Sequence, residues 1–202
     1  MENYAQLKSD IKSWTSSPDL TDAELDNCIT VTISRINREM RFRGMETLAD
    51  LTVDAQEVAL PSDFRGARSL YLDSSEAIDV RYMPPEVLDS LQRTGTGQPR
   101  YFTIRNATIR FDVAPDETYT GKLHYYQKFE TLSDSNETNW LTDNAPDLLL
   151  WGSCMAASLY TRDDKQMGTF ATLYEQALDG LSESDADVHG PAPVMRTEGS
   201  YP

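Results

Sequence analysis

One segment near the N-terminus specifies a long amphipathic helix. Thr21 and Glu24 stand at the spacing of a capping box, in which a hydroxyl and a carboxylate each accept a hydrogen bond from an unpaired backbone N–H. Leu20 and Leu25 occupy the two positions of a hydrophobic staple around this cap. The apolar stripe that follows consists of Leu25, Ile29, Thr32, Ile33, Ile36 and Met40. We therefore expect a helix from Thr21 to about Gly44, one face of which must be buried.

Three further segments show the helical period. The stripe Tyr4, Leu7, Ile11 and Trp14 predicts a short first helix. Near the C-terminus, one helix is expected from Pro146 through Tyr160 and another from about Lys165 to Leu181. Gly152 and Ala156 keep one side of the Pro146 helix small. A neighbouring backbone could therefore approach that side closely.

Between these helices the apolar residues alternate with polar ones, as in β-strands. The expected strands are 58–61, 69–73, 78–82, 102–104, 109–113 and 121–129. Asn106 stands at the turn of the hairpin that joins 102–104 to 109–113, where it can adopt the left-handed conformation. Pro84 opens a short helix, and residues 131–144 are expected to form a polar loop.

These elements predict an α+β fold. Residues 1–44 and 145–182 would form a helical bundle, with a β-rich middle region, 45–144, inserted between its two parts. Residues 183–202 are rich in Ser, Asp, Gly and Pro and cannot bury a core alone. We expect them to form a flexible C-terminal tail.

Charge and composition limit the possible partners. The 202 residues carry a net charge of −15, which argues against nucleic acid or an anionic membrane as the main ligand. No run of apolar residues is long enough to span a membrane, and the N-terminus lacks a signal-peptide pattern. Cys28 and Cys154 are expected to be small core residues without a disulfide, as in a reducing compartment.

No motif for catalysis, a metal or a cofactor is present in the sequence. His124 lies in an expected strand and His189 in the tail, and neither accompanies a nucleophile-elbow pattern. Phosphate-binding loops and metal-ligand spacings are likewise missing. An arginine cluster consists of Arg35, Arg38, Arg41 and Arg43. Because these arginines fan around the helix, a solvated or intersubunit salt-bridging face is favoured over a nucleic-acid patch.

The order of segments resembles a known family. The most specific parts are the strand Val58-Ala-Leu-Pro-Ser-Asp-Phe64 and the junction Asn139-Trp-Leu141 followed by Pro146-Asp-Leu148. Together with the opening helices, they are similar to the head-to-tail adaptor family of short-tailed bacteriophages, over about residues 3–181. The resemblance implies a structural subunit of the virion and not an enzyme.

Such adaptors are expected to form a ring, typically twelve-fold, that docks below the portal protein and carries the tail nozzle or tail tube. The ring would conduct DNA, retain the packaged genome, and have no contact with a membrane. The expected subunit-interface residues are Arg35, Arg38, Arg41, Gly152 and Ala156. The expected portal-binding residues, in a tail that orders on its partner, are Val194, Met195, Arg196 and Tyr201.

Two other classes of function stay open at the level of sequence. The β-rich middle region could be a module that binds a peptide or a sugar. Less favoured is a carboxylate-based cell-wall hydrolase, since acidic residues are abundant but no particular pair stands out.

Overall fold

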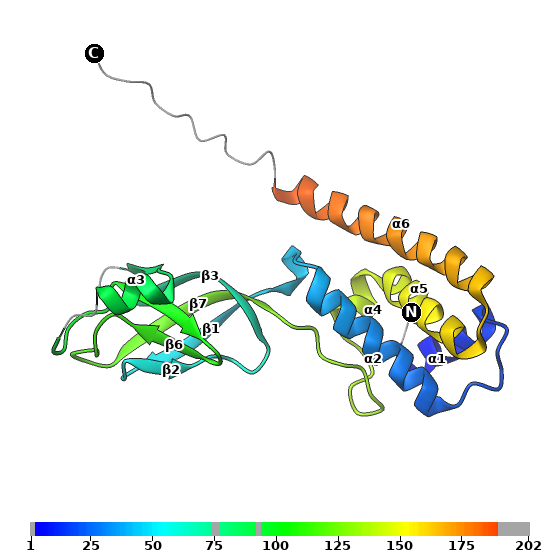
Figure 1. Cartoon of the computed structure of the whole chain (residues 1–202), viewed down its shortest axis with the longest axis horizontal. Helices are drawn as coiled ribbons and strands as arrows, with labels where there is room; N and C mark the ends of the chain where they lie inside the picture. Colours follow the sequence, from blue (N-terminus) through cyan, green and yellow to red (C-terminus); the bar gives the residue numbers. More distant parts are fainter. Residues whose placement is uncertain (1–2, 74–76, 92–93, 190–202) are drawn as a thin grey trace, which may run out of the picture. The chain divides into compact units, whose positions relative to one another are not determined.

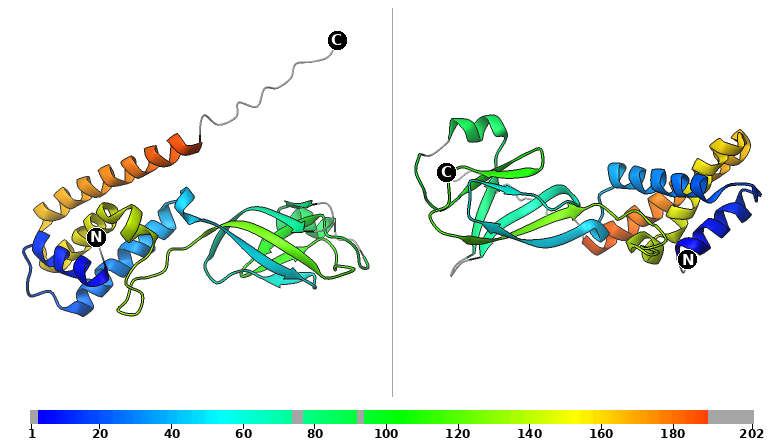
Figure 2. Two further views of the ribbon diagram at one scale, coloured as in Figure 1. Left: turned by 180° about the vertical axis from the view of Figure 1, so that it is seen from behind. Right: turned by 90° about the horizontal axis from the view of Figure 1, so that it is seen from below.

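The computed structural model describes residues 3–73, 77–91 and 94–189, and Figures 1 and 2 show its ribbon. The contacts divide the chain into two compact units. Met1–Arg43 and Phe129–Pro202 form the first, here called the helical unit. Gly44–Lys128 form the second, here called the β unit. The domain boundaries inferred from sequence stay predictions.

The helical unit contains two helices before the β unit and three after it, and all of them except α4 were expected from the sequence. They are α1 (Tyr4–Trp14), α2 (Asp22–Glu39), α4 (Trp140–Asn144), α5 (Pro146–Thr161) and α6 (Asp164–His189). The β unit consists of a 3-10 turn at its start (Arg43–Met45), then β1 (Glu46–Val53), β2 (Glu57–Ala59), β3 (Phe64–Asp73), β4 (Ile78–Tyr82), α3 (Pro85–Ser90), β5 (Tyr101–Arg105), β6 (Thr108–Phe111) and β7 (Tyr119–Gln127).

The start of α2 is as predicted. The Thr21 hydroxyl accepts a hydrogen bond from the Glu24 N–H at 3.4 Å, and a Glu24 carboxylate oxygen accepts one from the Thr21 N–H at 2.8 Å. The predicted end at Gly44 was wrong, because α2 ends at Glu39 and the next residue has extended backbone angles. This break lets Phe42 turn inward and bury its ring against Phe129 and Trp140, at centroid distances of 5.6 and 5.1 Å.

Helix α5 lies at the centre of the helical unit, where it packs against α1, α2, α4 and α6. The two cysteines are buried and free, as predicted. Figure 1 shows α6 running alongside α5 and continuing beyond it. The buried apolar side chains of this core include Leu7, Ile11, Leu25, Cys28, Ile29, Ile33, Ile36, Leu148, Leu149, Cys154, Ala157, Phe170 and Tyr174.

The β unit contains a seven-stranded sheet in the order β1-β7-β3-β4-β5-β6-β2. Its pairs are antiparallel except β4 and β5, which are parallel and joined through α3. The sheet is nearly closed, since the two end strands, β1 and β2, are consecutive in sequence and approach each other. Alternate residues point inward to one core, made of Leu51, Val53, Leu70, Leu72, Val80, Phe102, Ile109, Phe111, Tyr119, Leu123 and Tyr125.

The predicted fold class was therefore wrong. The chain is a mixed α/β fold whose described part contains a nearly closed seven-stranded sheet and six helices. The β region is not an appendage of a helical bundle, because it buries a hydrophobic core of its own. The predicted end of the last helix at about Leu181 was also wrong, since α6 continues to His189. Residues added to the end of an existing helix do not have to nucleate a new one. Helix α6 therefore extends past Leu181 although the residues there are polar.

Candidate assembly surfaces

Arg35 is half-buried between helices of the helical unit. Its guanidinium lies over the ring of Tyr174 at 5.0 Å, its Nη1 is 3.9 Å from the Met155 sulfur, and its Nε donates to Glu39 at 2.9 Å. The ion pair with Glu39 joins two residues four apart on α2, a spacing that places side chains next to each other on a helix. The same hydrogen bond lowers the pKa of Glu39 and raises that of Arg35. Arg35 therefore joins α2 to α5 and α6 within one chain.

Arg38 and Arg41 point to solvent. The side chain of Arg38 is 73% exposed and its Nη2 lies 3.2 Å from Glu39. Arg41 follows the end of α2 and is exposed. Arg43 falls outside α2 and begins the 3-10 turn Arg43–Met45. The exposed cations of this region are therefore near the C-terminal end of α2.

Gly152 is buried where α5 meets α2 and α6. A Cβ atom built on it would lie 2.5 Å from Cγ2 of Thr32 and 3.0 Å from the ring of Tyr174. The expected close approach therefore occurs between helices of one chain. Ala156 on the same helix is half-buried. The structure of the single chain does not test whether either residue contacts another subunit.

The four portal-binding residues predicted from sequence, Val194, Met195, Arg196 and Tyr201, lie outside the described residues. Other exposed side chains were not anticipated. Trp14 was expected on the buried stripe of α1 but is 55% exposed, with its ring edge against Trp151 at 4.9 Å. Leu159 and Tyr160, on the last turn of α5, are also exposed. Helical periodicity places these residues near the core, but tertiary packing decides which of them are covered.

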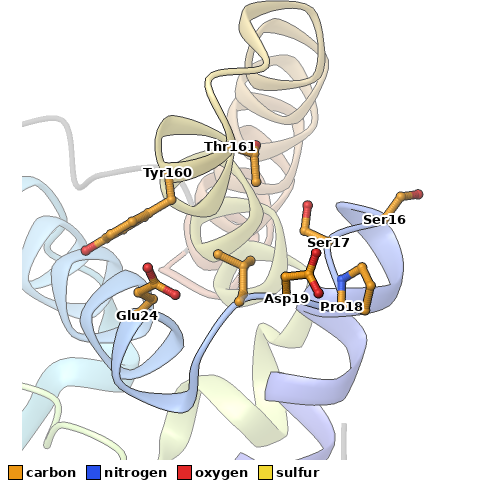
Figure 3. Close-up of a pocket in the computed structure, with 8 residues that line it drawn as sticks. Ser16, Ser17, Pro18, Asp19, Glu24, Tyr160 and Thr161 are labelled. Carbon is orange, nitrogen blue, oxygen red and sulfur yellow. The ribbon is translucent and has the colours of Figure 1, made fainter.

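A hollow of about 270 Å³ lies beside Tyr160, between the end of α5 and the loop that joins α1 to α2. Figure 3 shows Tyr160 and Glu24 on one side of it and Pro18 and Asp19 on the other. Hydrogen bonds from the backbone N–H and the hydroxyl of Thr21 lower the pKa of the Glu24 carboxyl group. The side chains that line the hollow include no histidine or cysteine.

In the β unit, three exposed apolar residues come from one short stretch of chain. They are Tyr82 at the end of β4 and Val87 and Leu91 on and just after α3. Asp89 forms an ion pair with Arg105 that attaches α3 to β5. A second hollow of about 270 Å³ adjoins Leu91. Its buried Asp112 accepts hydrogen bonds from two backbone N–H groups, at 3.0 and 3.2 Å, and therefore has a structural role.

His124 and the two cysteines belong to different units of the chain. His124 is on β7, as predicted, with its Nε2 3.4 Å from the carboxylate of Glu46. Burial raises the pKa of the Cys28 thiol to about 11 and that of Cys154 to about 12. Within residues 3–73, 77–91 and 94–189, no group of His, Cys, Asp and Glu could hold a metal ion. The helices of that part of the chain include none long and apolar enough to cross a membrane.

The chain thus consists of two folded units whose helices carry exposed apolar side chains, among them Trp14, Val31, Val87 and Leu159. The model of the SU10 adaptor protein family matches residues 2–196, and the chain accordingly belongs to this family of phage head-to-tail adaptors. No curated protein matches the sequence. Family membership indicates a structural role in the virion and association with portal and tail proteins.

Proposed function

We propose that this chain is the subunit of a ring that docks below the portal vertex, joins it to the tail, and conducts and retains the DNA. The observation that carries the proposal is the family match over residues 2–196, nearly the full length of the chain. A twelve-fold ring is the stoichiometry expected of such an adaptor. The ring is expected to bind both the portal protein and the tail nozzle or tail tube.

The charge of the chain supports a role as a DNA conduit. Thirty-three acidic residues outnumber eighteen basic ones, and twenty of the acidic residues belong to the helical unit. A surface with this excess repels the phosphate backbone, so DNA can slide past without being bound. DNA would therefore pass through the ring without sequence-specific contacts.

Two sets of residues are proposed to make the protein contacts. Arg38 and Arg41 are exposed and suited to ion pairs between subunits, while Arg35, Gly152 and Ala156 support the same helices from within. The segment that follows α6 is proposed to bind the portal. This segment would become ordered when it binds the portal, and its apolar and cationic side chains would anchor it there. These side chains are Val194, Met195, Arg196 and Tyr201.

Assembly on the portal tests the ring. The full chain is mixed with portal rings of the same phage, and the products are analysed by size-exclusion chromatography with light scattering and by electron microscopy. A ring of this chain on one face of the portal is the expected result. A chain that remains monomeric and never associates with the portal would contradict the proposal.

Two truncations test the portal-binding segment. Deleting residues 190–202 removes the four proposed contacts and leaves α6 intact, whereas deleting 183–202 also removes the end of α6. Both variants should fold, because Glu183 and Ser184 are exposed and the buried contacts of α6 come from Phe170 and Tyr174. Both should lose affinity for the portal. Normal attachment by the 190–202 deletion would place the contact elsewhere.

A further inference from the structure

One exposed face of α6, here called its outer face, carries a row of carboxylates. The first of them, Glu175, adds to the effect of Glu39 in raising the pKa of Arg35 on α2. Glu175, Asp179 and Glu183 are exposed and recur every four residues, so they form one stripe along the helix. Phe170 and Tyr174 are buried on the opposite face, and Trp151 of α5 stacks on Phe170. Like charges four residues apart destabilise a helix, and the sequence has no Lys or Arg from Thr169 to His189 that could relieve this repulsion within α6.

The acidic stripe continues beyond the part of α6 that α5 covers. The two helices are joined by a short turn at Arg162 and run antiparallel. Because α6 has 26 residues and α5 has 16, α6 is longer by about 15 Å at 1.5 Å per residue. Gly152 lies beside Tyr174, so α6 passes the start of α5 near Gly180. Asp179 and Glu183 therefore lie where α6 leaves its own partner helix.

The outer face of α2 has the opposite character. Asn27, Val31, Ser34 and Arg38 recur at spacings of four, three and four, and all four are exposed. Val31 is 60% exposed, which is high for a β-branched apolar residue on a helix. No acidic residue belongs to this stripe, and the exposed Arg41 follows its end. In a strongly acidic unit, this face is neutral to basic.

Lys8 and Lys12, near the start of the chain, are each paired with a carboxylate of the same chain. Lys8 lies 2.6 Å from Asp26, and Lys12 lies 3.5 Å from Asp22. Arg38 also has a partner in Glu39, but Arg35 shares that carboxylate, and Arg41 is exposed beside them. The end of α2 therefore has more cationic than acidic side chains and is suited to attract an external acidic surface. Helix α5 packs against both α2 and α6. The exposed residues of the two stripes lie on the parts of α2 and α6 that α5 does not cover.

We propose that the outer face of α2 in one subunit binds the acidic outer face of α6 in a second copy of this chain. Arg38 and Arg41 then pair with Asp179 and Glu183, while Val31 is covered by the neighbouring helix. The contact joins two different faces, so each subunit can bind one neighbour through α2 and another through α6. Repetition of such a head-to-tail contact closes into a ring when the rotation permits. The inference rests on the proposed ring and specifies its interface.

Charge reversal tests the contact. One variant carries Arg38→Glu and Arg41→Glu, a second carries Asp179→Lys and Glu183→Lys, and a third carries all four changes. Ring assembly on portal rings is measured by electron microscopy and light scattering, after circular dichroism has established that each variant is folded. The first two should assemble about tenfold more weakly or worse, because like charges then face each other. The third restores opposite charges and should recover assembly.

The control is Arg81→Glu, which makes the same change as each single substitution of the first variant, at a side chain of the β unit that is 75% exposed. It should assemble like the wild type. If both double variants form normal rings, the α2–α6 contact is wrong, while the proposal that the chain forms a ring is unaffected. A wild-type chain that forms no ring on the portal would overturn the proposed function, and the contact with it.

Cysteine cross-linking gives a second measurement. Ser34→Cys and Asp179→Cys are made in separate chains, mixed on portal rings and oxidised. Disulfide-linked dimers should form in the mixture and not with either chain alone, and the native cysteines do not interfere because both are buried. Rings that give no dimer in the mixture would contradict the contact.

Discussion

The side chain of Asn37 pairs with the backbone of Phe129 through two hydrogen bonds. Its Nδ2 donates to the Phe129 carbonyl at 3.0 Å, and its Oδ1 accepts from the Phe129 N–H at 2.8 Å. Phe129 is the residue at which the chain returns to the helical unit, and its ring stacks on Trp140. One polar side chain on α2 thereby fixes the returning segment, next to the aromatic rings that hold Phe42.

Replacing Asn37 by Ala should destabilise the helical unit by about 1–3 kcal/mol. Both backbone groups of Phe129 would lose their partner, and Phe129 is only 6% exposed. Urea denaturation followed by circular dichroism measures the change as a shift of the midpoint. Asn27→Ala, at an exposed position of the same helix, is the matched control and should shift it little. Equal midpoints for the two variants would show that the Asn37 pairing does not stabilise the fold.

Gly152→Ala should cost about 1–3 kcal/mol, because the added methyl group overpacks the contact between α5 and α2. Its Cβ would lie 2.5 Å from Cγ2 of Thr32, which is closer than two carbon atoms can approach. Gly180→Ala is the control, since nothing lies within 4 Å of a Cβ at that helical position. Alanine there should be neutral or stabilise by up to about 1 kcal/mol. Thermal denaturation of both variants measures the difference.

Thr32→Ser provides a compensating change for Gly152→Ala. It deletes the clashing Cγ2 and keeps the hydroxyl, which donates to the Cys28 carbonyl at 2.8 Å. The double variant should recover part of the lost stability, so the two changes should show a coupling energy in a double-mutant cycle. Strict additivity would mean that Gly152 is required for some other reason.

Local signals in the sequence predicted the parts of the fold that local interactions determine. The start of α2 follows from its capping box, and the left-handed Asn106 follows from the preference of asparagine for such turns. The end of α2 could not be found this way, because it depends on burying Phe42 against residues far along the chain. Strand β1 was missed since only Leu51 and Val53 of its eight residues are buried.

Helix α4 was missed for a different reason. Its capping box uses Asn139 and Thr142, a variant of the usual pattern that ends in glutamate or glutamine, inside a stretch that otherwise reads as a polar loop. The arginine cluster of the candidate interface was identified from the sequence. The sequence did not show that Arg35 packs on Tyr174 while Arg38 faces solvent, because this difference depends on the packing of α6. The acidic face of α6 went unnoticed, because net charge does not reveal which face a carboxylate takes.

Native thiols should be unreactive at pH 8. Burial raises the pKa of Cys28 to about 11 and that of Cys154 to about 12, so almost no thiolate is present, and both side chains are inaccessible. A disulfide-exchange reagent should react with two thiols per chain in guanidinium chloride and with almost none in buffer. Rapid reaction of the folded chain would show that the helical unit opens readily.

Tyr125 should make the β unit sensitive to alkaline pH. Burial and a hydrogen bond to Asp63, at 3.0 Å, raise the pKa of its hydroxyl to about 12, against about 10 in an unfolded chain. Folding therefore favours the neutral phenol. The contribution of Tyr125 to the free energy of unfolding is fully present below pH 10 and is lost as the pH rises from 10 to 12. Tyr125→Phe removes the ionisable group, and its stability should fall less steeply over this range than that of the wild type. Urea midpoints at pH 8, 10 and 11 measure the slope, with Tyr82→Phe as the exposed control. Identical slopes for Tyr125→Phe and the wild type would show that another group governs alkaline unfolding.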